Sequence, residues 1–186
     1  MDMKLEVVVV PVSDVHRAKR FYESLGCHVD IDYVGNESFR VVQLTPPGSE
    51  ASMHIGTGIT PAAPGSLQNT YLVVSDIEEA RADLVGRGID VSEVFHRDEA
   101  LRRVTGPNPE RRSYFSYASF SDPDGNSWLL QEIKKRLPGR TASQLLDAEV
   151  TDVLLSALKS AAAAHGVHEK ELGGLILTGH SGTPST

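Results

Sequence analysis

Hydrophobic residues in the first part of the chain follow two different periods. Residues 7–12 form a short β-branched run, which is typical of a strand. Ser13 and Asp14 then offer side-chain oxygens of the kind that cap a helix, and Gly26 supplies a stop signal. Between them, apolar residues recur with the spacing of one helical face: Val15, Ala18, Tyr22 and Leu25. The pattern predicts a strand followed by a helix.

Three shorter patterns after Gly26 predict strands. In HVDIDYV (28–34), Val29, Ile31 and Tyr33 alternate with polar residues, and FRVVQL (39–44) and SMHI (52–55) are short apolar runs. The same order returns later as NTYLVV (69–74), a helical segment from Asp76 to about Arg87, IDVSEVF (89–95), SYFSYASF (113–120) and SWLLQEI (127–133). Both halves therefore read as β-α-β-β-β, an α+β pattern.

The two halves also align in sequence without a gap. VPVSDVHRAKRFYESLGCHV (10–29) matches LVVSDIEEARADLVGRGIDV (72–91), so that Asp14 meets Asp76 and Gly26 meets Gly88. We predict a first module over 1–56, a linker over 57–67 and a second module over 68–135. An apolar stripe after residue 136 predicts a C-terminal helical extension (136–172), followed by a flexible tail (173–186).

Composition narrows the class of partner. The chain of 186 residues has 18 Lys and Arg against 25 Asp and Glu, a formal charge of −7, which argues against nucleic acid and anionic membrane surfaces. We expect no membrane span, because no long apolar run is present. The single cysteine, Cys27, permits no internal disulfide and fits a reducing cytoplasmic location. The apolar stripe of the extension needs a partner, so a homodimer is possible.

With VSD before each helix and SDPDGNSW before the last strand, the paired repeat resembles the vicinal oxygen chelate superfamily. This superfamily includes glyoxalase I, extradiol dioxygenases and bleomycin-resistance proteins, and the resemblance covers about residues 4–133. It implies a U-shaped incomplete barrel, with helices on the convex face and a ligand on the concave face. The LLQEIKKRLPGR ending (129–140) looks like a glyoxalase-like bacterial branch.

Alternation along each strand predicts which side chains face that cavity. Leu72 and Val74 are expected to face the helix, and by the repeat Val8 and Val10 do the same. We therefore predict ligand-binding positions at Val7, Val9, Val41, Gln43, Asn69, Tyr71, Phe120, Leu129 and Gln131, with His54 beside them. Val7 and Val9 are alternatively simple packing residues.

The resemblance also implies where a metal would be held. In metal-using relatives a His, Gln or Glu stands seven residues before each capping aspartate, where this chain has Val7 and Asn69. A Glu stands three residues after the Asn of DPDGN, where this chain has Leu129, and a fourth ligand falls near His54. Valine and leucine have no lone pair and neutral Asn is a poor ligand, so we predict neither a metal nor another cofactor.

Three functions remain open from the sequence. The first is a binding protein that holds an aromatic or antibiotic-like molecule. The second is a metal-independent lyase or isomerase in which His54, with Tyr71 or His96, supplies acid/base catalysis. The third is a metal enzyme with a non-standard ligand set, drawn from His54, His96 or Glu132. The arginine-rich segment 97–112 is either a lid over the ligand or an ordinary flexible loop.

Overall fold

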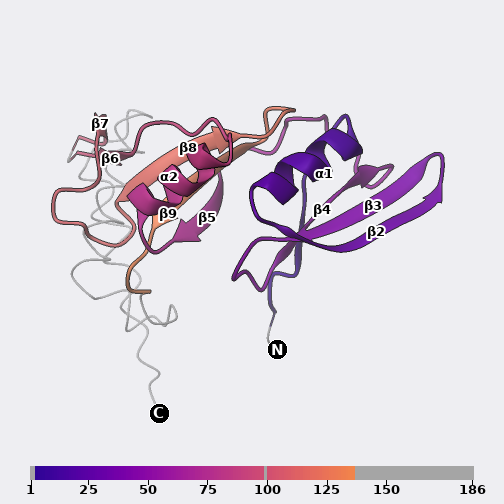
Figure 1. Cartoon of the computed structure of the whole chain (residues 1–186), viewed down its shortest axis with the longest axis horizontal. Coiled ribbons are helices and arrows are strands. Elements are labelled where there is room, and N and C mark those ends of the chain that lie inside the picture. Colours follow the sequence, from indigo (N-terminus) through magenta and orange to yellow (C-terminus); the bar gives the residue numbers. More distant parts are fainter. Residues whose placement is uncertain (1–2, 99, 137–186) are drawn as a thin grey trace, which may run out of the picture. The chain divides into compact units, whose positions relative to one another are not determined.

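The first half of the chain forms a four-stranded sheet with one helix (Figure 1). This computed structural model describes residues 3–98 and 100–136, so the predicted extension and tail lie outside the described residues from 137 on. The elements are β1 (Val7–Val9), α1 (Val15–Ser24), β2 (His28–Asn36), β3 (Phe39–Thr45) and β4 (Ser52–Thr57), and the strand order is β1-β4-β3-β2. Helix α1 packs on β3 and β4.

The second half repeats this arrangement. It consists of β5 (Thr70–Val74), α2 (Ile77–Gly86), β6 (Phe95–Arg97), β7 (Arg103–Thr105), β8 (Ser116–Ser121) and β9 (Ser127–Glu132). The strand order is β5-β9-β8-β6-β7, with the short β7 added at the edge. Helix α2 packs on β8 and β9. Two open sheets that each carry one helix confirm the predicted α+β class with paired β-α-β-β-β modules.

The predicted second strand of the second half (89–95) is shorter than expected. Apart from Phe95, the segment 89–95 does not join the ladder, although Ile89, Val91 and Val94 are all buried. The apolar residues of 89–94 therefore pack in the core without forming a strand.

Both helices begin at the aspartates that the repeat brings into register. The carboxylate of Asp14 accepts from the Arg17 amide at 3.0 Å, and that of Asp76 accepts from the amides of Glu78 and Glu79, also at 3.0 Å. These bonds satisfy N–H groups that have no partner inside a helix. At the end of α1, Gly26 has φ +100°, a conformation that favours glycine.

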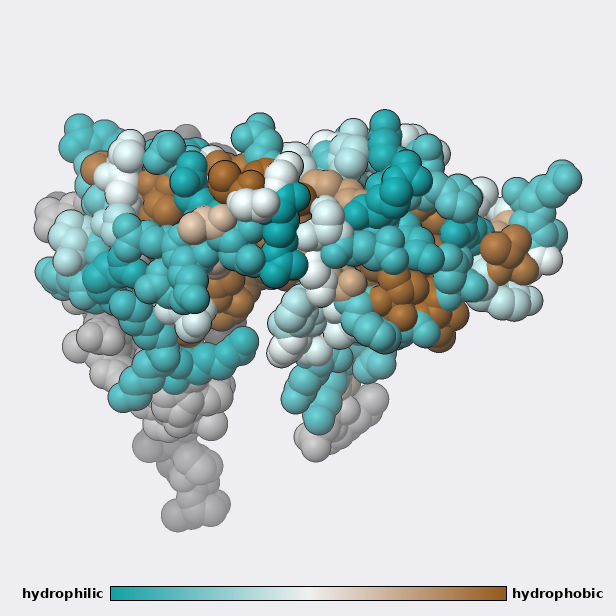
Figure 2. Space-filling view, viewed as in Figure 1, coloured by the Kyte–Doolittle hydropathy of each residue, from teal (hydrophilic) through white to brown (hydrophobic). Residues whose placement is uncertain are grey.

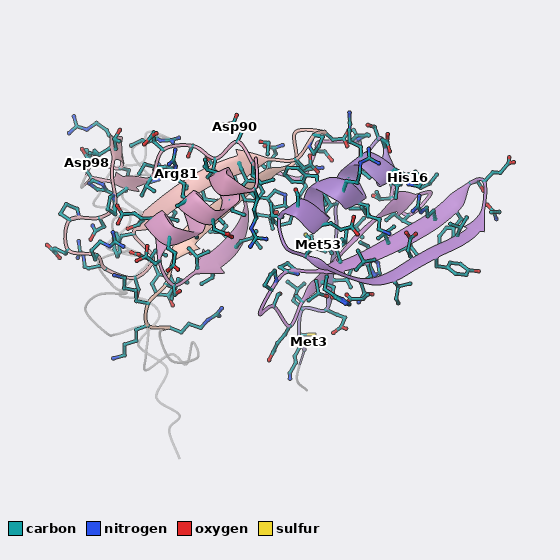
Figure 3. All side chains as sticks on the ribbon, viewed as in Figure 1. Met3, His16, Met53, Arg81, Asp90 and Asp98 are labelled. Atoms are coloured by element: carbon teal, nitrogen blue, oxygen red, sulfur yellow. The ribbon has the colours of Figure 1, made fainter. Side chains whose placement is uncertain are left out.

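Residues 3–96 and 104–135 form one compact unit with a common hydrophobic core. Residues 97, 98, 100–103 and 136 belong to a second unit, in which Asp98 accepts from the Arg102 amide at 2.8 Å. In the core, Phe21 of α1 lies 6.3 Å from Phe120 of β8, measured between ring centroids. Met53, labelled in Figure 3, is also buried, on the helix side of β4.

The DPDGN turn (122–126) links the second module to the first. Asn126 is fully buried and donates to the carbonyl of Pro11 at 2.8 Å and to Asp122 at 2.7 Å, while its own oxygen accepts from Leu67. Asp122 also accepts from the Tyr22 hydroxyl at 2.8 Å, and burial together with this carboxylate raises the pKa of Tyr22. The motif therefore has a structural role at the contact between the modules.

Candidate functional site

Each sheet has one face covered by its helix and an opposite face, which we call the open face. On the first sheet the register places Val9 opposite His54, and His54 opposite Gln43. Paired residues point to the same side of a sheet, and alternate residues along a strand share a side. The open face of the first sheet is therefore formed by Val7, Val9, Ile31, Tyr33, Phe39, Val41, Gln43, Thr45, Ser52 and His54.

A β-bulge in β2 changes the predicted alternation. Val29 pairs with Leu44 on the helix side, whereas Ile31 pairs with Gln43 on the open face. Strict alternation had put Val29 and Ile31 on one face, but the extra residue of the bulge separates them. It also brings Asp30 within reach of Gln43 and Thr45.

Polar side chains on this face are connected by hydrogen bonds. His54 Nε2 lies 3.0 Å from Gln43 Oε1, and Gln43 Nε2 lies 3.3 Å from both Asp30 Oδ2 and Ser52 Oγ. Thr45 Oγ1 is 2.5 Å from Asp30 Oδ2 and 2.7 Å from Ser52 Oγ. The hydrogen bond from Thr45, followed by that from His28, holds the pKa of Asp30 below its usual value. We call these five side chains, Asp30, Gln43, Thr45, Ser52 and His54, the Gln43 network.

The second sheet has a corresponding open face. Tyr71 pairs with Leu129, and Val73 pairs with Gln131. On the other side of β9, Ser119 of β8 pairs with Leu129 and Tyr117 pairs with Gln131. The Gln131 amide donates to the carbonyl of Tyr114 at 3.0 Å, and the Tyr117 hydroxyl donates to the same carbonyl at 2.5 Å. Phe95 extends the face, with its ring 5.6 Å from that of Tyr117.

Large apolar side chains are left exposed on both faces. Tyr71 is 54% exposed, Tyr33 56% and Ile31 51%, and the others are Val9, Phe39 and Val73. Figure 2 shows hydrophobic residues at the surface along the β2–β3 part of the first module. The rings of Tyr33 and Phe39 lie 6.5 Å apart in an edge-to-face arrangement. Clustered exposed apolar side chains of this kind make the open faces a candidate interaction surface.

The structure brings most of the predicted ligand-binding residues onto these faces. Val7, Val9, Val41, Gln43 and His54 share the open face of the first sheet. The open face of the second sheet contains Tyr71, Leu129 and Gln131. Asn69 precedes β5, has φ +54° and is bonded through its backbone amide to Ser127.

Phe120 does not line either open face, contrary to the sequence-based expectation. It pairs with Trp128, which directly precedes the open-face residue Leu129. Both rings are buried and stacked, with centroids 6.5 Å apart. Since Leu129 faces the open side, its neighbour Trp128 and the paired Phe120 must face the core.

His96, a predicted catalytic residue, does not lie on an open face. It pairs with Ser116, a fully buried residue on the helix side of β8. Its Nδ1 lies 2.9 Å from the carbonyl oxygen of Gly106 and therefore carries the proton. Tyr71 lies on the opposite, open face of the same sheet, so the two alternative partners predicted for His54 lie on different faces.

Arg111 in the predicted lid segment is fixed on the helix side. Its guanidinium donates to Glu132 at 2.8 Å, to Glu78 at 2.5 Å and to Asp76 at 3.4 Å. Glu132 is fully buried and also accepts from the Ile77 amide at 3.3 Å. At Arg111, therefore, the segment is tied to the helix side of the second sheet.

The donor set does not fit the metal that the superfamily implies. Val7 and Leu129 stand at two of the implied ligand positions and carry no donor atom. Glu132 is paired with Arg111, and His96 with a carbonyl, so neither joins His54. In the part of the chain that the structure describes, no three His, Cys, Asp or Glu side chains are placed to hold a metal ion.

A pocket of about 230 Å³ lies elsewhere, beside α2 in the second module. It is lined by Glu78, Arg81, Glu93, Val94, Thr105, Gly106 and Pro107, none of which is a predicted site residue. Arg81, labelled in Figure 3, is bonded to the carbonyl of Ser92 and to Glu93. The charged groups of this pocket are already bonded to protein partners, whereas the open faces carry exposed apolar side chains. We therefore take the open faces as the candidate site.

Sequence reasoning missed several open-face residues. Tyr117 and Ser119 were accessible to it, because alternation along SYFSYASF places them opposite to Phe120. Asp30 was not, since its position depends on the bulge. Thr45 and Ser52 lie at strand ends, where short apolar patterns give no signal.

Comparisons with known proteins agree with this architecture. Residues 4–130 match the family described as Glyoxalase/Bleomycin resistance protein/Dioxygenase superfamily. No curated protein matches the chain. In the described residues, no helix is long and apolar enough to cross a membrane.

Solved structures give the same result. TnmS3, an antibiotic binding protein from Streptomyces sp. CB03234, is 30% identical, with a TM-score of 0.55 over 71% of this chain and 97% of that one. A glyoxalase/bleomycin resistance protein from the same organism is 31% identical, with a TM-score of 0.53 over 69% and 100%. A superfamily member from Sphaerobacter thermophilus is 26% identical, with a TM-score of 0.54 over 70% and 98%. The chain therefore belongs to the glyoxalase/bleomycin resistance protein/dioxygenase superfamily.

Proposed function

We propose that this protein binds a small, largely apolar organic molecule, aromatic or antibiotic-like, on the open faces and without the superfamily's metal. The main support for this proposal is that exposed apolar side chains surround a few polar ones on these faces. Binding sites for small molecules combine the same two ingredients. Similarity to an antibiotic binding protein supports the class of ligand.

The chemistry at the implied metal positions supports binding without a metal. Val7 pairs with Ser52, and the apolar row continues through Val9. Leu129 lies between Tyr71 and Ser119 on the second open face. Aliphatic side chains at these positions suit contact with a hydrocarbon ring, whose burial is favourable in proportion to the apolar area removed from water.

Arginine at position 9 is expected to weaken binding of an apolar probe by about tenfold or more, because a charge would have to be desolvated against the ligand. Naphthol is a suitable probe, titrated by calorimetry into tag-free protein in the presence of a chelator. Val85, on the outside of α2, is 45% exposed and provides the matched control, Val85→Arg. Equal affinity in Val9→Arg and Val85→Arg would show that the probe does not use the open face.

A metal-independent lyase or isomerase is the second candidate. It is favoured by His54, whose Nε2 is bonded to Gln43 while its other ring nitrogen has no hydrogen-bond partner among the described residues. An imidazole in this position is suited to acid/base catalysis. Turnover of a bound compound that disappears in His54→Ala, with binding retained, would establish the enzyme instead of the binding protein.

We further infer that the protein works in the cytoplasm as a homodimer. The inference rests on the single cysteine and on the apolar stripe of residues 136–172, which lies almost entirely outside the described residues. Sedimentation of the full chain tests the dimer: a species of one chain mass at micromolar concentration would exclude it.

A further inference from the structure

We propose that Gln43 fixes His54 in the tautomer with hydrogen on Nε2, which leaves Nδ1 as an acceptor that selects ligands carrying a hydroxyl or N–H donor. The inference rests on the proposed binding function and names the chemical class of its ligand. Its source is the order of donors and acceptors in the Gln43 network, which admits only one arrangement.

The carboxylate of Asp30 sets the direction of the network. An ionised carboxylate accepts hydrogen bonds and donates none. Thr45, 2.5 Å away, therefore donates to it, and Ser52, at 2.7 Å from the Thr45 oxygen, must donate to Thr45. Each hydroxyl has one hydrogen, so the Ser52 oxygen is left to accept from a further group.

The amide of Gln43 is oriented by these acceptors. One of its terminal atoms lies 3.3 Å from both Asp30 Oδ2 and Ser52 Oγ, and that atom must be the nitrogen, since it alone donates. The reverse orientation would place the amide oxygen against a carboxylate. Gln43 Oε1 is thereby turned toward His54, on the neighbouring strand β4.

His54 then has one possible neutral form. Its Nε2 is 3.0 Å from an oxygen that only accepts, so Nε2 carries the hydrogen. A neutral imidazole has a single N–H, and Nδ1 is therefore the bare acceptor. Within residues 3–98 and 100–136, Nδ1 has no hydrogen-bond partner, and the side chain is half-buried.

The surroundings of His54 determine what this acceptor recognises. Along the row across the sheet, Val9 lies on one side of His54, and Ile31 lies beyond Gln43 on the other. One acceptor between aliphatic side chains suits a flat apolar molecule with a single donor, such as a phenol or an enol. A ligand without the donor would cover Nδ1 and leave it unpaired, which is unfavourable.

The first arm of the test needs no ligand. Protein labelled with nitrogen-15 histidine is observed by long-range proton–nitrogen correlation at about pH 8, where an imidazole is ordinarily neutral. The His54 signals are identified by their loss in His54→Leu. A protonated Nε2 with a bare Nδ1, changing to a mixture in Gln43→Leu, is the expected result. Hydrogen on Nδ1 in the unaltered protein would overturn the inference.

The second arm compares naphthol with its methyl ether, which has the same rings and no donor. We expect the unaltered protein to prefer naphthol by roughly 10- to 100-fold. In His54→Leu the two affinities should become about equal. Equal affinities in the unaltered protein would overturn the inference while leaving the binding function in place, whereas failure of both probes to bind would contradict the binding function itself.

Discussion

Replacing Arg111 with methionine is expected to lower the free energy of unfolding by about 3–5 kcal/mol. Glu132 has no exposed surface, and Arg111 provides its charge partner at 2.8 Å. Among the described residues, the Ile77 amide at 3.3 Å is then the only remaining donor to Glu132 Oε1, and Oε2 already lacks a partner. An uncompensated buried charge is therefore left beneath the start of α2.

The double variant Arg111→Met with Glu132→Gln separates charge from shape. A neutral amide keeps an oxygen for the Ile77 amide but removes the buried charge, so we expect the double variant to be more stable than Arg111→Met alone. Urea unfolding with an unchanged m-value measures both differences. If the free energy of unfolding of Arg111→Met lies within about 1 kcal/mol of that of the unaltered protein, the Arg111–Glu132 pair does not have the predicted role in stability.

Replacing Asn126 with alanine is expected to lower the free energy of unfolding by about 3 kcal/mol or more, because several buried bonds are lost together. The Pro11 carbonyl, the Asp122 carboxylate and the Leu67 amide each lose the Asn126 side chain as a partner. The bond to Leu67 joins the linker to the DPDGN turn, and the bond to Pro11 joins the segment after β1 to the same turn. The contact between the modules should therefore weaken as well.

Asn36→Ala provides a control in which the side chain also bonds a nearby amide, that of Ser38 at 2.9 Å, but at an exposed turn. We expect it to lower the free energy of unfolding by no more than about 1 kcal/mol. Asn126→Asp should be at least as damaging as Asn126→Ala, since it keeps the acceptor and places a second carboxylate beside Asp122. Similar stabilities for Asn36→Ala and Asn126→Ala would contradict the structural role given to the motif.

The sequence predicted the paired modules because its two halves align without a gap, so that each element of one half has a counterpart in the other. Asp14 and Asp76 align in sequence, and both cap helices in the structure. The same alignment separated Val7 and Val9 from Val10, which is fully buried. Regular alternation is sufficient wherever a strand has no irregularity, as in β3 and β9.

Features that depend on long-range contacts escaped prediction. The bulge in β2 moved Ile31 to the open face, and nothing in HVDIDYV marks it. Phe120 was predicted to line the cavity, whereas its register with Trp128 places it on the core side. Arg111 was one of several arginines in an irregular segment, and only folding selects it as the partner of Glu132.

Titration of valine-methyl-labelled protein with naphthol is the most direct test of binding at the open faces. The chain contains its own controls, since Val9, Val41 and Val73 lie on these faces, while Val10 and Val42 are fully buried on the helix side. We predict that methyl signals of the three open-face valines shift on titration and that those of Val10 and Val42 stay in place. Shifts confined to helix-side valines, or no shifts up to the solubility limit of the probe, would contradict the account.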